Sequence, residues 1–423
     1  MKVFKFGGAS VKDADAVKNV AGILKQFSNE NLVVVISAMG KTTNGLERLC
    51  NSFFFGEGNS AEILEEIRSF HTTILEDLFP DKNHPVFNEI HNTIVELEWA
   101  IEEKPTHTYD CEYDQIVSIG EILSTKIVSA YLNENGVSNK WRDARDFIKT
   151  DNTYREAKVD WELTEKIIHE DLVPFFNSGQ KQLVVTQGFI GVTSENFTTT
   201  LGREGSDYSA AILAWCLDAE SVTIWKDVHG VLNADPKWFD ETKLIPQLTY
   251  QDAIELTYYG ATVIHPKTIK PLQNKKIPLY VRSFVSPEKD GTKIHEEQVH
   301  LPVPCFIFKV NQVLLSISPK DFSFIVEENL GDIFELFAKH RVKMNVMLNS
   351  AISFSVSVDN DPLKLPALME KLQENYRVLY NEDVELVTIR YYDQATIDRV
   401  IAGKQIFLEV KSRYTVQLVM KNN

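Results

Sequence analysis

Lys5 and the residues that follow it have the composition of a phosphate-binding turn. The run Lys5-Phe6-Gly7-Gly8 places a lysine at the end of a short β-type segment and a glycine pair at the start of a helix. Because glycine has no Cβ, its backbone N–H can approach an anion, and a helix N-terminus adds partial positive charge. The lysine supplies a compact charge suited to phosphate. Such a turn can also be purely structural, and the run alone does not decide between the two.

A second polar stretch, Thr198–Asp207, leads into a predicted helix over 208–217, and its run of threonines, two glycines, an arginine and an aspartate suits an anionic ligand. The planar fork of Arg203 can pair with a carboxylate through two hydrogen bonds. When desolvated, such charged bonds contribute about 1.5–3 kcal/mol each, against about 0–1 kcal/mol for an exposed ion pair. Asp207 falls at the expected N-cap of the helix, so simple capping is the alternative interpretation.

Ser37–Asn44 is a hydroxyl- and amide-rich loop directly after the apolar run Leu32–Ile36. Its Gly40-Lys41-Thr42 imitates the end of a Walker A loop, but that motif needs glycine at position 35, which is valine. The P-loop interpretation is therefore rejected. A ligand-binding loop and an ordinary solvated loop both remain open.

Two further stretches are weaker signals on their own. Glu121 lies in the first turn of a predicted helix, where a carboxylate often only complements the helix dipole. Trp225–Lys237 leaves a predicted strand and continues as a loop with glycine and proline, which carries two carboxylates and the lysines Lys226 and Lys237. Taken alone, it is an ordinary connection between a strand and a helix.

The elements that would position these residues alternate between strand and helix. Lys2–Phe6 has the pattern of a strand, Asp13 can cap an amphipathic helix, and Leu32–Ile36 is apolar without alternation, as in a parallel strand buried on both faces. Positions 45–103 are mostly helical in pattern, and further buried strands are predicted over 183–192, 222–228 and 277–282. We therefore expect an α/β fold with a mainly parallel sheet sandwiched by helices. In such sheets ligands bind at the carboxyl ends of the strands.

The pattern changes near residue 300. Leu301-Pro302-Val303-Pro304 is a plausible linker, because proline cannot continue a helix. We expect a catalytic domain over 1–300 and a smaller α+β domain over 305–423, built from short strands and helices.

Composition excludes several classes of function. The chain has 423 residues and a net charge of −16, from 44 basic and 60 acidic residues, so nucleic acid and anionic membranes are poor partners. The four cysteines are scattered and form no C-x-x-C pair, which argues against a zinc ribbon or a disulfide framework. The N-terminus lacks a signal-peptide pattern, and no apolar run approaches the ~20 residues of a membrane span. We expect a cytoplasmic protein.

Taken together and in order, these stretches resemble the amino acid kinase family, and within it the aspartokinases. The resemblance covers roughly residues 1–300. It is carried by Lys5–Gly8, Ser37-Ala38 with Thr43-Asn44, Gly120-Glu121, Gly188–Gly191, Thr200–Asp207 with Glu204 in place of a glycine, Asp227–Pro236, and Tyr259-Gly260-Ala261 with His265-Pro266. The tail from about residue 305 resembles paired ACT regulatory modules, with the C-terminal module abbreviated.

The resemblance implies ATP-dependent phosphorylation of the L-aspartate side-chain carboxylate, giving 4-phospho-L-aspartate, the first step toward lysine, threonine and methionine. Lys5 would contact the transferred phosphoryl group, and Asp207 would organise the reacting groups. Aspartate would be held by Ser37, Thr43, Glu121 and Arg203. Nucleotide would be held by Lys5, Phe6, Gly7, Gly8, Lys226, Asp227 and Lys237, and Mg²⁺ would arrive with ATP rather than at a protein metal site. A homodimer, with lysine or threonine as an effector of the regulatory domain, is also expected.

Some positions depart from the family pattern. Ala9, Lys226, Leu232 and Thr262 differ from its usual residues, which affects the expected nucleotide contacts more than the aspartate contacts. Asn345 and Ala351 stand where lysine-inhibited relatives have acidic residues, so we expect weak inhibition by lysine or a different effector. Two alternatives stay open: a kinase for another amino-acid carboxylate, and a non-catalytic amino-acid sensor.

Overall fold

The computed structural model describes residues 1–179, 182–239, 241–261, 264–297, 303–321 and 323–422. They form two compact units. The first comprises Met1–Val231, Pro246–Ile254 and Ile264–Val299, and the second comprises Leu232–Ile245, Glu255–Val263 and His300–Asn423. Thr262 and the first two residues of the predicted linker, Leu301 and Pro302, lie outside the described residues. No helix in these ranges is long and apolar enough to cross a membrane.

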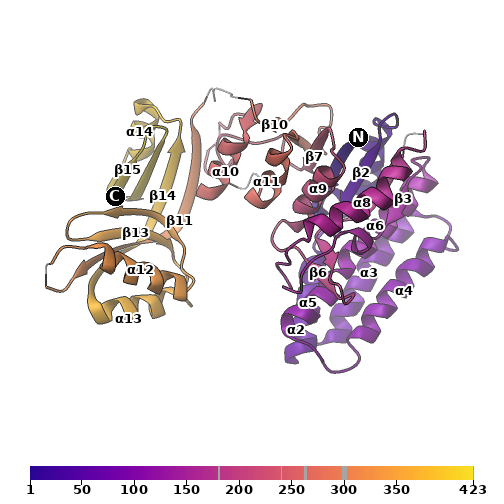
Figure 1. Ribbon diagram of the computed structural model, residues 1–423, viewed down its shortest axis with the longest axis horizontal. Coiled ribbons are helices and arrows are strands. Elements are labelled where there is room, and N and C mark those ends of the chain that lie inside the picture. Colours follow the sequence, from indigo (N-terminus) through magenta and orange to yellow (C-terminus); the bar gives the residue numbers. More distant parts are fainter. Residues whose placement is uncertain (180–181, 240, 262–263, 298–302, 322, 423) are drawn as a thin grey trace. The chain divides into compact units, whose positions relative to one another are not determined.

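A mainly parallel sheet forms the centre of the first unit (Figure 1). Its strands in the described part of the chain are β1 (Lys2–Phe6), β2 (Leu32–Ile36), β3 (Lys140–Arg142), β4 (Leu183–Gln187), β7 (Ser221–Lys226), β8 (Gln247–Thr249), β9 (Leu279–Ser283) and β10 (Thr292–His295). They are ordered β3-β4-β2-β1-β7-β9-β10-β8, and β9 and β10 run antiparallel. β1 lies between β2 and β7, with both of which it is parallel. The chain thus leaves β1 toward one side of the sheet and returns later on the other, which makes β1 a topological switch point.

Helices cover both faces of this sheet, which confirms the predicted fold class. The helices of the first unit used below are α1 (Ala14–Lys25), α2 (Thr42–Phe55), α3 (Ser60–Leu78), α4 (Pro85–Ala100), α5 (Tyr109–Val117), α6 (Ile119–Glu134), α7 (Ala144–Phe147), α8 (Trp161–Phe176), α9 (Gly205–Cys216) and α11 (Pro266–Asn274). On one face α9 packs on β1, β2 and β7, with α8 and α11 beside it. On the other face α1 and α6 share an apolar core with Phe4 and Phe6, and α2, α3 and α4 add to that layer. The alternation of β1 therefore sends Phe4 and Phe6 into that core and Lys5 toward α9.

Several predicted elements are confirmed, and two details were wrong. Asp13 caps α1, since its Oδ1 accepts a hydrogen bond from Ala16 N at 2.8 Å. The single strand predicted over 183–192 is divided, because Phe189 turns the backbone with φ 71°, and β5 (Ile190–Val192) pairs with β6 (Thr198–Thr200) in a separate small sheet. The helix predicted over 208–217 begins earlier, at Gly205. Glu204 therefore occupies the N-cap position assigned to Asp207, which lies within the first turn instead.

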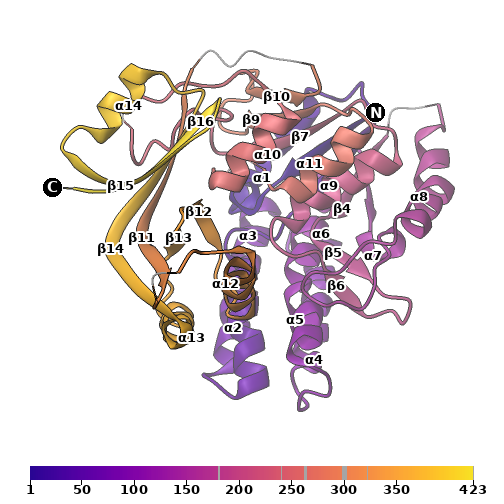
Figure 2. The same ribbon diagram turned by 60° about the vertical axis from the view of Figure 1, so that its left-hand side comes forward.

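The second unit contains an antiparallel sheet ordered β12-β13-β11-β14-β16-β15. Its strands in the described ranges are β11 (Cys305–Pro319), β12 (Met344–Asn349), β13 (Phe354–Asp359), β14 (Tyr376–Arg390), β15 (Lys404–Lys411) and β16 (Thr415–Asn422). β11 and β14 are long neighbours (Figure 2). Their register shifts between Lys309 and Leu314. Each of these strands therefore serves two halves of the sheet.

Each half of this sheet has its own apolar core. In one half, α12 (Glu327–Lys339) and α13 (Leu365–Asn375) pack on β13 and the C-terminal part of β11 through Ile333, Phe337 and Leu368. In the other half, α14 (Gln394–Ile401) packs on β14 and β16, with Ala234 and Phe239 adding to the core. The arrangement of short helices on an antiparallel sheet is that of the expected ACT-type α+β domain.

Candidate active site

A cavity of about 830 Å³ opens at the carboxyl ends of the central strands of the first unit. Lys5 of β1, Ser37 after β2, Phe189 after β4 and Lys226 of β7 all line it. Parallel strands end at the same edge of a sheet, which brings these residues together although they are far apart in the chain. Glu121 of α6 contributes from the helical layer.

Lys5 and Asp207 form the ion pair at the centre of this cavity. Lys5 Nζ lies 2.6 Å from Asp207 Oδ1, and the two side chains are only 12% and 4% exposed. The early start of α9 explains the pair, because Asp207 sits inside the first turn and faces β1 rather than capping its own helix. Removing either partner of such a buried pair would leave the other charge uncompensated.

The glycine pair lets the backbone approach this centre. A Cβ at Gly8 would lie 2.7 Å from Ala38 O and 2.9 Å from Gly40 O, which no side chain can tolerate. A Cβ at Gly7 would lie 3.3 Å from Lys5 Nζ and would crowd its ammonium. The turn after β1 and the loop after β2 are therefore packed directly against one another, as a narrow anion-binding turn requires.

Glu121 is a buried carboxylate that faces the same cavity. Its Oε1 accepts a hydrogen bond from Ala38 N at 3.3 Å, and its buried Oε2 has no hydrogen-bond partner among the described residues. Burial raises the pKa of Glu121 to about 8. A carboxylate in this state is suited to an ammonium group brought by a ligand, which would supply the missing partner and lower the pKa again.

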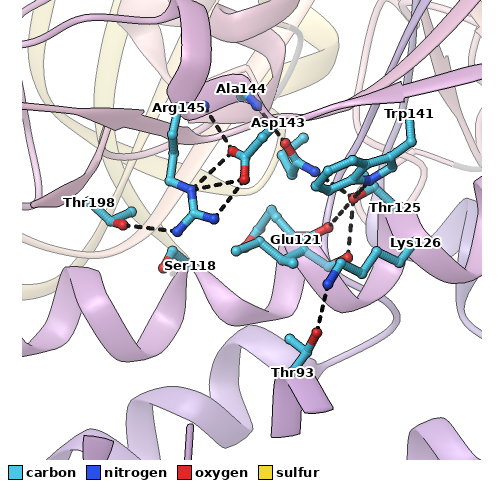
Figure 3. Close-up of polar contacts among 12 residues, drawn as sticks. Thr93, Ser118, Glu121, Thr125, Lys126, Trp141, Asp143, Ala144, Arg145 and Thr198 are labelled. Carbon is cyan, nitrogen blue, oxygen red and sulfur yellow. Dashed lines mark hydrogen bonds and ion pairs between the residues drawn. The ribbon is translucent and has the colours of Figure 1, made fainter. Parts of the chain in front are cut away.

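A hydrogen-bond network fixes the first turn of α6 that carries Glu121 (Figure 3). The hydroxyl of Thr125 donates to Glu121 O at 2.9 Å and accepts from Trp141 Nε1 at 3.0 Å. Gln187 at the end of β4 donates to the same hydroxyl at 2.8 Å, and its Oε1 accepts from Ala144 N at 2.7 Å. The orientation of Glu121 is thus tied to the sheet and to α7.

Arg203 extends from a loop that is anchored at several points. Lys267 donates to Leu201 O at 2.9 Å, and Glu204 Oε2 accepts from His265 N at 3.0 Å. Gly202 and Glu204 both have left-handed backbones, with φ 77° and 55°. Arg203 itself is exposed, lines the cavity, and has no ion-pair partner in the part of the chain that the structure describes. Its guanidinium is available to a ligand.

The cavity brings together most of the predicted site residues, namely Lys5, Ser37, Thr43, Glu121, Arg203, Asp207 and Lys226. The side chain of Phe6 lies in the core instead, stacked on Trp225 with ring centroids 5.7 Å apart, so that only its backbone can face a ligand. Asp227 is exposed and does not line the cavity. Lys237 and Leu232 belong to the second unit.

Sequence reasoning missed one wall of the cavity. Asp110 and Tyr113 of α5, the loop Thr153–Glu156, and Ser206 also line it. Ser206 could have been found, because it adjoins Asp207 in the motif. The loop carries no recognisable pattern, and its placement depends on contacts with β6 that no local sequence signal reveals.

Residues 1–283 match the amino acid kinase family, and the chain belongs to this family. The lysine-sensitive aspartokinase 3 of Escherichia coli is 32% identical over 414 residues, which cover 96% of this chain and 90% of that protein. The crystal structure of E. coli aspartokinase III with lysine and aspartate in the T-state has a TM-score of 0.82 at 29% identity, and covers 99% of this chain and 95% of that one. The R-state structure with aspartate and ADP has a TM-score of 0.80 at 29% identity and covers 99% and 96% of the two chains. Within the amino acid kinase family, the protein is thus an aspartokinase.

Proposed function

We propose that this protein transfers the γ-phosphoryl group of ATP to the side-chain carboxylate of L-aspartate, giving 4-phospho-L-aspartate and ADP. The observation that carries the proposal is the shared cavity, in which the Lys5–Asp207 pair lies with Arg203 and Glu121. Aspartate has two carboxylates and one ammonium, and this cavity offers cations together with a buried carboxylate oxygen that lacks a partner among the described residues. We assign catalysis to the first unit and regulation to the second.

In the proposed complex, Arg203 pairs with a carboxylate of aspartate and Glu121 accepts from its ammonium. The hydroxyls of Ser37 and Thr43, which line the same cavity, donate to the remaining carboxylate oxygens. A substrate without the ammonium, such as an N-acetylated acid, would leave Glu121 Oε2 buried and unpaired. The site therefore favours a free amino acid.

Phosphoryl transfer here needs positioning and neutralisation of charge more than covalent help. The attacking carboxylate is already ionised at neutral pH, so no strong general base is required. Lys5 stabilises the charge that develops on the transferred group, and Asp207 holds the Lys5 ammonium in place. The turn at Gly7 and Gly8 admits phosphate close to the backbone.

The nucleotide would carry Mg²⁺, bound mostly through phosphate oxygens and water. When bound, the ion neutralises charge on the phosphates. Among the described residues, no group of three or more His, Cys, Asp or Glu side chains is arranged to hold a metal ion. Lys226 at the end of β7 lines the cavity, and we assign it to the nucleotide.

Trapping the acyl phosphate with hydroxylamine tests the proposal. The protein is incubated with Mg-ATP and, separately, with aspartate, glutamate or N-acetylglutamate. We expect a hydroxamate with aspartate. A hydroxamate formed only from another acid would change the substrate, and none from any acid would favour the amino-acid sensor.

We further propose that the second unit responds only weakly to lysine or binds a different effector. Asn345 accepts from Lys309 Nζ at 2.8 Å and donates to Asp359 Oδ1 at 2.9 Å and to Gln312 Oε1 at 2.8 Å. Its amide is therefore engaged within the sheet, and a neutral amide carries no charge to attract the amine of an effector. Assays with lysine and with threonine test this, and cooperative inhibition by lysine alone at low concentration would contradict it.

We also propose a homodimer. β12 is an edge strand of the second sheet, and Met347 and Leu348 on it are 50% and 44% exposed. An unpaired edge with apolar side chains is suited to pairing with a second copy of the chain.

A further inference from the structure

We infer that Asp114 is a positioning residue for the aspartate subsite. Its buried carboxylate lies behind the cavity wall that the sequence did not predict and fixes the backbone from which Arg203 extends. The inference rests on the proposed function, because it concerns how the same site holds its carboxylate substrate.

The hydrogen bonds of Asp114 join two segments that are distant in the chain. Oδ2 accepts from Arg155 N at 2.9 Å and from Thr200 N at 2.8 Å, and Oδ1 accepts from the hydroxyl of Thr200 at 2.7 Å. Asp114 itself is 0% exposed and belongs to α5, while Thr200 ends β6 and Arg155 lies in a loop. A side chain on one helix thus fastens a strand end and a loop together.

Both fastened segments form the wall of the cavity. Thr200 and Arg155 line it, as does Gly202, whose Cα lies so close to the loop that an added Cβ would be 3.2 Å from Arg155 O. Thr200 O also accepts from Ala157 N at 3.0 Å. Arg203 follows only three positions after Thr200 in the chain. A displacement at Thr200 would therefore carry over to the guanidinium that we assign to aspartate.

The backbone of Arg155 shows why this anchor is needed. Arg155 has a left-handed backbone, with φ 66°, which a residue other than glycine keeps only where the surroundings hold it. Its N–H bond to Asp114 is one constraint. Its guanidinium provides others, because it lies 4.4 Å from the ring centroid of Tyr113 and 3.3 Å from Asp110 Oδ1.

Burial also makes the anchor sensitive to pH. It raises the pKa of Asp114 to about 6, against the lowering effect of the bonds from Arg155 and Thr200. The other titratable groups around it are Arg155 and Tyr154 from the loop, Cys111 and Tyr113 from α5, and Cys50 from α2. The ionised carboxylate of Asp114 accepts hydrogen bonds from Arg155 N, Thr200 N and the Thr200 hydroxyl. The protonated carboxyl, which prevails below about pH 6, has an O–H group that would face one of these donors and weaken that hydrogen bond.

The test is the variant Asp114→Asn in the full-length protein. Its amide has one acceptor oxygen and one donating nitrogen, so it cannot accept from Arg155 and Thr200 as the carboxylate does. We expect the KM for aspartate to rise about tenfold or more, with the KM for ATP within about twofold and kcat less affected, since misplacement of a binding group by about 1 Å is costly. The ratio of the aspartate KM values of variant and native protein should shrink as pH falls from 7.5 to about 5.5.

Two comparisons separate positioning from general loosening. Asp151 is an exposed residue of the same loop, and it accepts hydrogen bonds from Thr153 N at 3.1 Å and from Lys158 N at 2.9 Å. The control variant Asp151→Asn should change the KM for aspartate less than about twofold. In a double-mutant cycle, Thr200→Val should remove only part of the effect of Asp114→Asn, because valine deletes the hydroxyl donor of Thr200 but keeps the backbone donors of Thr200 and Arg155.

Three outcomes would overturn the inference. The KM for aspartate could be unchanged in Asp114→Asn, the KM values for aspartate and ATP could rise equally in that variant, or Asp151→Asn could raise the KM for aspartate as much as Asp114→Asn does. If a variant loses turnover, calorimetric titration with aspartate in the absence of nucleotide still measures its affinity for aspartate. Thermal unfolding of each variant shows whether it is folded. If the native protein forms no hydroxamate with aspartate, the proposed function fails; if it does and the KM of the variant is unchanged, only the role of Asp114 fails.

Discussion

Glu121 combines two demands that oppose one another in a folded protein. It must be buried to meet a small ligand away from water, yet burial disfavours its charged form and raises its pKa from 4.5 to about 8. The folded state therefore favours the protonated carboxyl. Its contribution to stability is complete below pH 4.5 and is lost as pH rises toward 8, because the buried carboxylate must then ionise.

Glu121→Gln should consequently stabilise the free protein at alkaline pH. We expect the free energy of unfolding at pH 8.5 to rise by an amount on the order of a few kcal/mol, with little change at pH 5. Aspartate binding should weaken in the same variant, because a neutral amide lacks the negative charge that attracts an ammonium. Thermal unfolding at the two pH values and calorimetric titration measure both effects. An equal change of stability at both pH values would contradict this account of Glu121.

Lys5 is expected to act mainly in the transition state. In Lys5→Ala, kcat should fall by about 10²–10³ while the KM for aspartate changes little, because the contact strengthens as charge develops on the phosphoryl group. Lys2→Ala is the matched control, since Lys2 lies on the same strand and pairs with Glu30 at 2.6 Å outside the cavity. Steady-state kinetics decide, and a rise in the KM for aspartate at unchanged kcat would refute the assigned role.

Among the elements, the turn between β1 and α1 is packed closely against the loop after β2. Gly8→Ala should push the turn away from the loop after β2, because the new Cβ would meet the carbonyl oxygens of Ala38 and Gly40. We expect a loss of roughly 1–3 kcal/mol in stability and weaker binding of ATP. Gly22→Ala in α1 is the control, since a Cβ there meets nothing within 4 Å and should stabilise the helix by about 0.5–1 kcal/mol. Chemical denaturation and nucleotide titration provide the comparison.

The elements also show how far sequence reasoning reaches. The apolar run of β2, the cap at Asp13 and the glycines after β1 are local signals, and they predicted the strands, helices and turn that form one side of the cavity. The start of α9 was missed because Glu204 adopts a left-handed backbone that is unusual for a glutamate. It keeps this backbone through its bond to His265 N, a residue 61 positions away.

The wall around Asp114 was missed for a similar reason. An aspartate in the middle of α5 has the sequence of an ordinary polar helix position. Its function comes from the meeting of α5 with β6 and with the loop at Arg155, and those contacts span 86 and 41 positions of the chain. Charge, periodicity and spacing describe neighbours in sequence, whereas this wall is defined by neighbours in space.

For the whole molecule, assembly is expected to depend on the edge strand of the second sheet. We predict a dimeric mass for the native protein by light scattering and a monomeric mass for Met347→Asp, because a charge on this edge opposes pairing. Leu363→Asp is the control, since Leu363 is 88% exposed but lies in the turn before α13 rather than on β12. A native monomer, or a dimer that survives Met347→Asp, would contradict pairing through β12.

The two long strands of the second unit have a consequence for how this protein could have changed over time. β11 begins in the half of the sheet that contains α14 and ends in the half that contains α12 and α13. β14 runs the opposite way, from the half with α12 and α13 back to the half with α14. Neither half can be deleted, duplicated or exchanged by a single cut in the gene without severing a strand of its neighbour. Such interleaving ties the inheritance of both halves together, because the loss of one interrupts two strands of the other.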